Sequence, residues 1–92
     1  MTVHTLKTWA EPFEAQWIGA KCFELRFNDR HYAIGDELIL REWDQGAQQF
    51  RARAIRMVVT TMTSGVLGLL PGYCILGTRI TCRYTTYTPA NG

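Results

Sequence analysis

The sequence predicts a small α+β domain that is mainly β, a compact barrel of about five or six strands with one helix near the N-terminus. The chain has 92 residues, enough for one domain with a modest core. Most segments alternate apolar and polar residues with the period of strands, and only one segment has a helical period. The short turns between them favour hairpins, because an all-parallel sheet would need a crossover helix between its strands.

The first elements are a short strand and the helix. Residues 3–7 alternate as a strand does. Trp9, Phe13 and Trp17 then recur every fourth residue, which is typical of a helix that packs its aromatic face on the core. A proline in the first turn and a glycine after the last turn fit a helix over residues 10–19.

A second strand is expected over residues 21–27. Its odd-numbered residues from position 23 onward are large and apolar, whereas Glu24 and Arg26 are charged. Because side chains alternate between the two faces of a strand, we expect the apolar set to face the core. Glu24 and Arg26 would then share the opposite face.

The rest of the chain reads as strands and loops. In order, we expect a strand over 37–44, a polar hairpin turn over 45–49, a strand over 50–61 that bends near Arg56, a long loop over 62–72 and a strand over 73–81. After Cys82 the composition changes to Thr, Tyr, Pro, Asn and Gly. We therefore predict a domain over residues 1–82 and a flexible tail over residues 83–92.

Composition excludes several classes of protein. A formal charge of +2 is small for a domain held on nucleic acid by charge alone, although eight of the ten basic residues are arginine, which suits bidentate contacts. The apolar runs are far shorter than the ~20 residues that span a bilayer. The three cysteines form no C-x-x-C pair, which favours a reducing, cytoplasmic location. His4 and His31 have no zinc-site spacing with them, so we expect no metal and no cofactor.

Common catalytic motifs are absent: there is no P-loop, no dinucleotide-binding glycine motif, no H-E-x-x-H and no nucleophile elbow. What remains is the polar segment over residues 19–30. Within it Lys21, Glu24 and Arg26 can meet in a cleft, where the carboxylate could read hydrogen-bond donors or act as a base and the cations could hold phosphate. The alternative is that Glu24 and Arg26 form an ordinary surface ion pair.

The pattern G-x-K-x-x-E-x-R over residues 19–26, followed by Gly35-Asp36, resembles the ASCH domain family of the PUA-like superfamily. The similarity is to an uncharacterised subgroup from phages and bacteria, and it extends to about Leu76. It also includes these further segments: 4–7, the helix around Phe13, 24–30 and 40–43.

This resemblance implies a PUA-like barrel with a cleft between the barrel and the helix, which binds RNA or a nucleotide-like ligand. Similar proteins are amidohydrolases on an acylated cytidine, using a lysine and a threonine, and others are described as ribonucleases. Lys21 matches that lysine, but Glu24 stands where the threonine would be. A carboxylate cannot replace a hydroxyl nucleophile directly, so the chemistry would differ.

We therefore predict an RNA-binding or nucleotide-binding module whose candidate site residues are Lys7, Lys21, Glu24, Arg26, Asn28, Arg30, Arg41 and Trp43. One alternative is a hydrolase on a nucleoside or RNA, with Lys21 and Glu24 as candidate catalytic residues. Another is a phage accessory protein that binds a host protein through a sheet edge or the apolar loop at 66–70. Arg51 and Arg53 either extend a basic stripe toward the cleft or are solvated charges, and Trp43 either stacks on a base or packs in the core.

Overall fold

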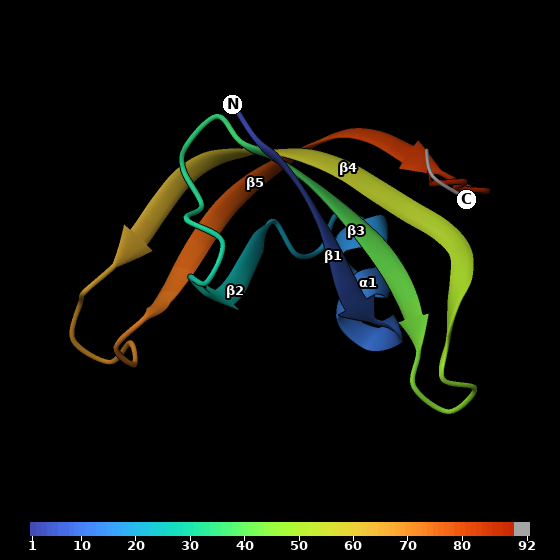
Figure 1. The fold of residues 1–92 in the computed structure, drawn as a ribbon, viewed down its shortest axis with the longest axis horizontal. Coiled ribbons are helices and arrows are strands. Elements are labelled where there is room, and N and C mark those ends of the chain that lie inside the picture. The colour runs from blue at the N-terminus through green and yellow to red at the C-terminus, as the bar shows by residue number, and fades with distance from the viewer. Residues whose placement is uncertain (90–92) are drawn as a thin grey trace.

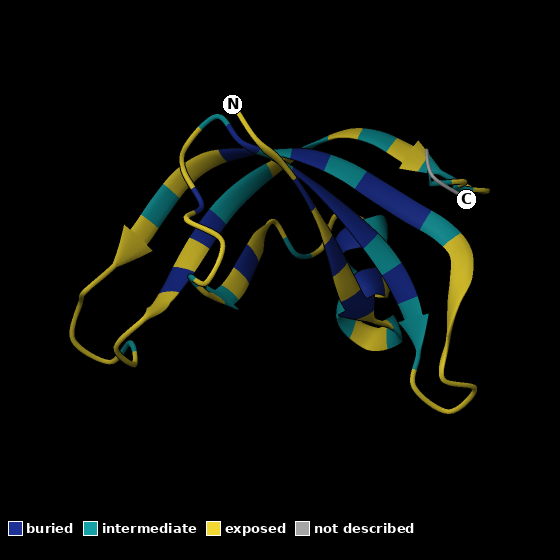
Figure 2. Cartoon of the chain, in the orientation of Figure 1, coloured by how far each residue is buried: buried dark blue, intermediate teal, exposed yellow. Residues whose placement is uncertain are grey.

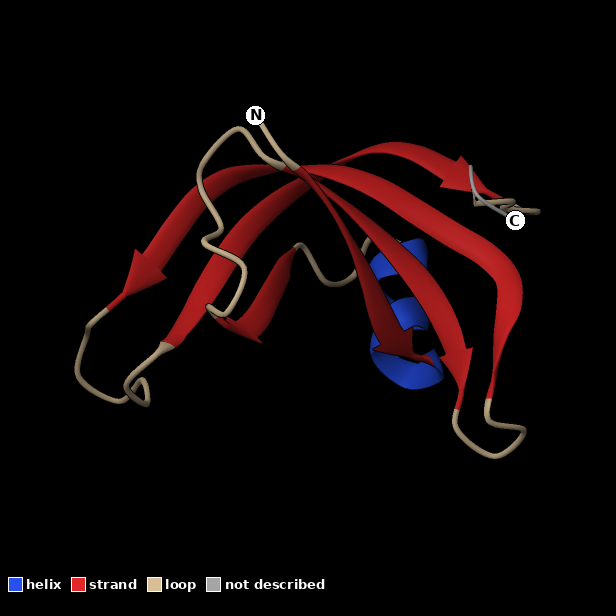
Figure 3. Cartoon of the chain, viewed as in Figure 1, coloured by secondary structure: helices blue, strands red, loops and turns tan. Residues whose placement is uncertain are grey.

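The computed structural model describes residues 1–89. Its elements are β1 (Val3–Trp9), α1 (Ala10–Trp17), β2 (Phe23–Phe27), β3 (Glu37–Asp44), β4 (Gln49–Ser64) and β5 (Tyr73–Tyr84). The predicted fold class is confirmed, because the domain is mainly β with one short helix (Figure 3). Within the described residues, no helix has the length and apolar character needed to cross a membrane.

The strands form one sheet in the order β1-β3-β4-β5-β2. The β1–β3 pair is parallel and the other pairs are antiparallel. The sheet curls into a half-barrel that arches over α1 (Figure 1). Shifts of register between Arg56 and Met57, and between Val59 and Thr61, help the long strands to bend, which confirms the bend expected near Arg56. β1 and β2 are the two edges of this sheet.

The core lies on the concave side of the arch, between the sheet and α1 (Figure 2). Its largest fully buried apolar side chains are Phe13, Leu38, Leu40, Ile55, Met57 and Leu76. Phe13 is the helix residue that fills this space, and the half-buried Trp17 stacks beside it with the ring centroids 6.0 Å apart. Trp9 precedes the helix and is 57% exposed, so the expectation of three core-facing aromatics is wrong at Trp9.

Burial in β2 is the reverse of the expected pattern. Glu24 is only 3% exposed, whereas Phe23, Leu25 and Phe27 are between 46% and 53% exposed. The reason is tertiary: α1 covers only the concave face of this edge strand, and Glu24 meets polar partners there. The apolar side chains lie on the outer face, which no other element covers within residues 1–89.

Several boundaries differ from those expected. β2 begins at Phe23 rather than Lys21, and β4 continues to Ser64, which shortens the predicted loop. β5 continues to Tyr84, beyond the predicted domain boundary. The backbone N–H of Tyr87 also donates to the carbonyl of Ala52 at 2.7 Å, so part of the predicted tail is held on β4. The last part of that tail, residues 90–92, lies outside the described residues.

Candidate functional site

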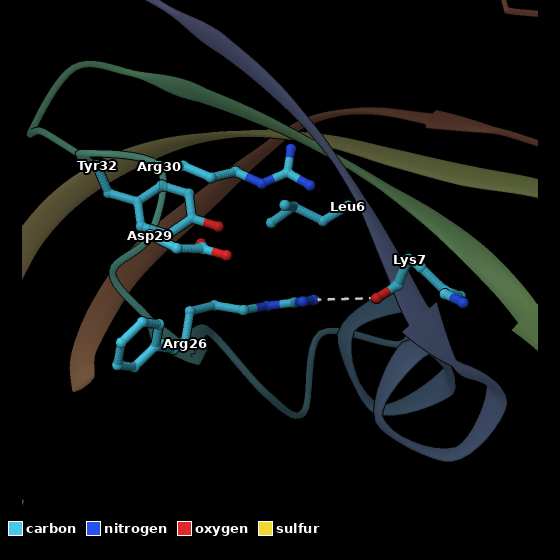
Figure 4. Close-up of a pocket in the computed structure, with 7 residues that line it drawn as sticks. Leu6, Lys7, Arg26, Asp29, Arg30 and Tyr32 are labelled. Atoms are coloured by element: carbon cyan, nitrogen blue, oxygen red, sulfur yellow. Dashed lines mark hydrogen bonds between the residues drawn. The ribbon is translucent and has the colours of Figure 1, made fainter. Parts of the chain in front are cut away.

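Arginine side chains bridge the gap between the two edges of the sheet. Nη2 of Arg26, on β2, donates to the carbonyl of Lys7 at 3.3 Å and to Oγ1 of Thr8 at 3.1 Å on β1. Nη1 of Arg30 donates to the carbonyl of Thr5 at 3.1 Å. Figure 4 shows Arg26 reaching the Lys7 carbonyl, with Arg30 extended above it. The half-barrel therefore has an opening spanned by guanidinium groups.

This opening is a cleft in two parts, and Arg26 lines both of them. One part has a volume of about 280 Å³ and is lined by Leu6, Lys7, Arg26, Phe27, Asp29, Arg30 and Tyr32. The other has a volume of about 290 Å³ and is lined by Lys7, Thr8, Trp9, Pro12, Lys21, Glu24, Leu25 and Arg26. Each part is near the lower end of the ~300–1,000 Å³ usual for small-molecule sites.

Glu24 lies at the base of the second part and is surrounded by donors. Oε1 accepts a hydrogen bond of 2.9 Å from Nε2 of Gln16 and lies 3.7 Å from Nζ of Lys21. Oε2 accepts from Nε of Arg26 at 3.1 Å. Both oxygens of this buried carboxylate are therefore engaged, and they fix the directions of Arg26 and Lys21.

Several polar groups of the cleft are free to form hydrogen bonds with a ligand. Within residues 1–89, Nη1 of Arg26, Nε and Nη2 of Arg30, the Tyr32 hydroxyl and the Asp29 carboxylate have no hydrogen-bond partner. Burial raises the pKa of Tyr32, against the opposing effect of Arg26 and Arg30, so its hydroxyl stays a neutral donor. The cleft thus offers several donors and one carboxylate acceptor.

The loop that carries Arg30 and Tyr32 is held from both ends. Oδ1 of Asn28 accepts from the backbone N–H of Tyr32 at 2.9 Å, and Oδ2 of Asp36 accepts from the N–H of Ala33 at 3.1 Å. Asn28 therefore shapes this loop and lines a different hollow, beside the loop between β4 and β5. The structure does not place it among the residues that line the cleft.

Arg41, Trp43 and the side chain of Lys7, all predicted as site residues, lie on the outer face of the sheet. The ammonium of Lys7 sits 4.3 Å from the centre of the Trp43 ring, and only the Lys7 backbone faces Arg26 (Figure 4). The guanidinium of Arg41 sits 3.9 Å from the centre of the Phe50 ring. Lys21, Glu24, Arg26 and Arg30 are thus brought together in the cleft, but Arg41 and Trp43 are not.

Arg51 and Arg53 form ion pairs away from the cleft. Arg53 bonds both oxygens of the buried Glu42, at 3.0 Å each, and Arg51 bonds Asp44. Hydrogen bonds from Arg53 to Glu42 and then to Glu14 raise the pKa of Arg53 further above its usual range. Arg53 thus holds α1 to the hairpin of β3 and β4, whereas Arg51 pairs within that hairpin. Neither arginine extends a basic stripe into the cleft.

Sequence reasoning missed four residues of the site: Thr8, Gln16, Asp29 and Tyr32. Thr8 has the parity of His4 and Leu6 in β1, which would have placed it on the buried face. No local signal marks Gln16 or Tyr32, because their roles arise from contacts between distant elements. Among residues 1–89, no group of three or more His, Cys, Asp or Glu side chains is placed to hold a metal.

The reversed burial in β2 makes a direct prediction. Glu24→Ala should lower the free energy of unfolding by about 1–3 kcal/mol, because it leaves Gln16 and Arg26 without their buried acceptor. Leu25→Thr, which replaces a half-exposed side chain with a β-branched residue that favours strands, should cost less than about 1 kcal/mol. Urea unfolding of both variants measures this difference. A larger loss for Leu25→Thr would contradict the orientation of β2.

Comparison with known proteins identifies relatives of this chain. It is 39% identical over 61 residues to an uncharacterized 12.9 kDa protein in the GpA 3' region of Escherichia phage P2. The match covers 66% of this chain but 54% of that relative, so it spans about half of the relative's length. The model of the family described as a domain of unknown function, DUF3850, matches residues 3–78, and the chain belongs to this family.

Proposed function

We propose that the cleft between β1 and β2 binds a nucleotide-like ligand, as a free nucleotide or as part of an RNA. The observation that carries the proposal is the set of uncommitted donors at the opening: two guanidinium groups, each with free N–H groups, and the Tyr32 hydroxyl. Such donors suit phosphate oxygens, because guanidinium groups make strong charge-assisted bonds to phosphate.

The positions of the charged groups in the cleft would orient the bound nucleotide. Arg26 and Arg30 hold the phosphate, and Asp29, as the uncommitted carboxylate, accepts from a ribose hydroxyl or a base amine. Glu24 acts as a positioning residue, since both its oxygens already accept from protein donors. The same saturation weighs against Glu24 as a general base, and so against the hydrolase alternative.

The resemblance to the ASCH family supports the proposal independently of the cleft. Its pattern G-x-K-x-x-E-x-R supplies Lys21, Glu24 and Arg26, three residues that meet at this opening. PUA-like proteins of that kind are associated with RNA or nucleotide-like ligands. A relative encoded by a phage is compatible with this role and adds nothing about the ligand.

Titration of the ¹⁵N-labelled protein with a mononucleotide, the corresponding nucleoside and a short single-stranded RNA tests the proposal. Shifts should centre on Arg26, Arg30 and Tyr32, and the nucleoside should bind more weakly because it lacks the phosphate. Arg30→Ala should weaken nucleotide binding by roughly ten-fold to a hundred-fold, since it removes one charge-assisted contact. Binding should also fall as salt rises.

Arg79→Ala is the matched control, because Arg79 is an exposed arginine of β5 that lines neither part of the cleft. It should leave mononucleotide affinity unchanged. An equal loss of affinity in Arg30→Ala and Arg79→Ala would mean that only the net charge matters, which would contradict a specific contact from Arg30. No shift with any of these ligands at low salt would overturn the proposed function.

A further inference from the structure

A second surface rich in aromatic rings lies on the outer face of the sheet, across β1, β3 and β4. Lys7 pairs with Arg41, and Trp9 with Trp43, in the parallel β1–β3 ladder, so these four side chains share one face. Trp43 is also paired with Phe50 across the β3–β4 ladder. We call Lys7, Trp9, Arg41, Trp43, Phe50 and Tyr87 the outer aromatic track.

Contacts between rings and cations run through the track from Lys7 to Tyr87. The Trp43 and Phe50 rings meet edge to face with centroids 4.9 Å apart. Arg41 lies 3.9 Å from the centre of the Phe50 ring and 5.6 Å from that of Tyr87. The rings and cations therefore form one row from the edge of the sheet to the C-terminal segment.

The track is partly open to solvent, and its two cations are not paired with carboxylates. Trp9 is 57% exposed and Phe50 is 39% exposed, and Arg41, Trp43 and Tyr87 are half-buried. Within residues 1–89, neither Lys7 nor Arg41 has an ion-pair partner. The neighbouring acids of β3 are engaged elsewhere, Glu42 with Arg51 and Arg53, and Asp44 with Arg51.

We propose that the outer aromatic track binds single-stranded nucleic acid. Rings that are open to solvent stack on bases of any sequence, and unpaired cations between them attract the phosphates that link those bases. A double helix would not fit this chemistry, because its bases are stacked on each other and shield their faces. The track adjoins the cleft at β1, where Lys7 and Trp9 lie at the border of both, but Arg41, Trp43, Phe50 and Tyr87 line neither part of the cleft.

Fluorescence anisotropy with labelled single strands of about ten nucleotides, as RNA and as DNA, tests this proposal. Trp43→Leu and Arg41→Gln should each weaken strand binding by roughly five-fold to a hundred-fold. Lys7→Gln removes only an exposed charge, so it keeps the test valid if Trp43→Leu fails to fold, and it should lower the salt dependence of binding. Equal affinity for RNA and DNA would point to stacking and phosphate contact alone, whereas preference for RNA would point to contacts with the 2′-hydroxyl.

Two controls separate this surface from the cleft. Arg79→Gln removes an exposed arginine outside the track and should leave strand affinity unchanged. The Arg41 and Trp43 variants should bind mononucleotide as the unaltered protein does, whereas Arg30→Ala should weaken mononucleotide binding and still bind the strand through the track. Strand binding without mononucleotide binding would contradict the proposed function of the cleft and would support this inference. No strand binding at low salt, or binding indifferent to Arg41 and Trp43, would overturn it.

Discussion

Phe13→Ala is expected to lower the free energy of unfolding by about 3–5 kcal/mol, the usual loss for truncating a buried phenylalanine. Phe13 is fully buried and is the residue through which α1 fills the concave side of the sheet. Its ring also lies against Trp17 and under the guanidinium of Arg53. Truncation leaves a cavity at the place where the helix is attached. Urea unfolding followed by far-ultraviolet circular dichroism measures the loss.

Trp9→Ala is the matched control, because Trp9 belongs to the same row of aromatics spaced by four residues. With 57% of its surface exposed, it should lose less than about 1 kcal/mol. A loss at Trp9 as large as that at Phe13 would contradict the placement of the helix. It would favour the sequence-based expectation that both side chains are in the core.

Local sequence patterns were sufficient to locate the helix and the strands, but not to predict which of their faces are buried. The recurrence of aromatics located the helix at Ala10–Trp17, within the expected range, yet it could not say that Trp9 ends a strand and faces solvent. Alternation located β2 in the same way and assigned its faces the wrong way round. Alternation gives two faces, and only the position of α1 decides which of them is covered.

The candidate site, too, could be predicted only where its residues are close in the sequence. The polar segment led to Lys21, Glu24, Arg26 and Arg30, because these residues are close in sequence and the cleft is built around them. On β1, Lys7 was predicted from the resemblance, whereas Thr5 and Thr8 could not be found from spacing, since the curl of the sheet brings its two edges together. Arg41 and Trp43 carry suitable chemistry, but their parity in β3 directs them to the outer face.

Asp36→Ala is expected to lower the free energy of unfolding by about 3 kcal/mol at neutral pH, because it leaves buried donors without an acceptor. Asp36 is 5% exposed and accepts from Nε2 of His4 at 2.9 Å. It also accepts from the backbone N–H groups of Thr2 and Ala33, both at 3.1 Å. One carboxylate thus joins the start of β1 to the loop that carries Arg30 and Tyr32, so the variant should also weaken ligand binding in the cleft.

The contribution of Asp36 to stability should depend on pH in a defined direction. The hydrogen bond from His4, followed by that from Thr2, holds the pKa of Asp36 below its usual value. A carboxyl with a lowered folded-state pKa stabilises the protein above its unfolded pKa of ~3.9 and loses this effect as pH falls through the folded value. The stability difference between the unaltered protein and Asp36→Asn should therefore be constant above about pH 5 and shrink below it. A stability difference that grew on acidification below about pH 5 would contradict the assigned network.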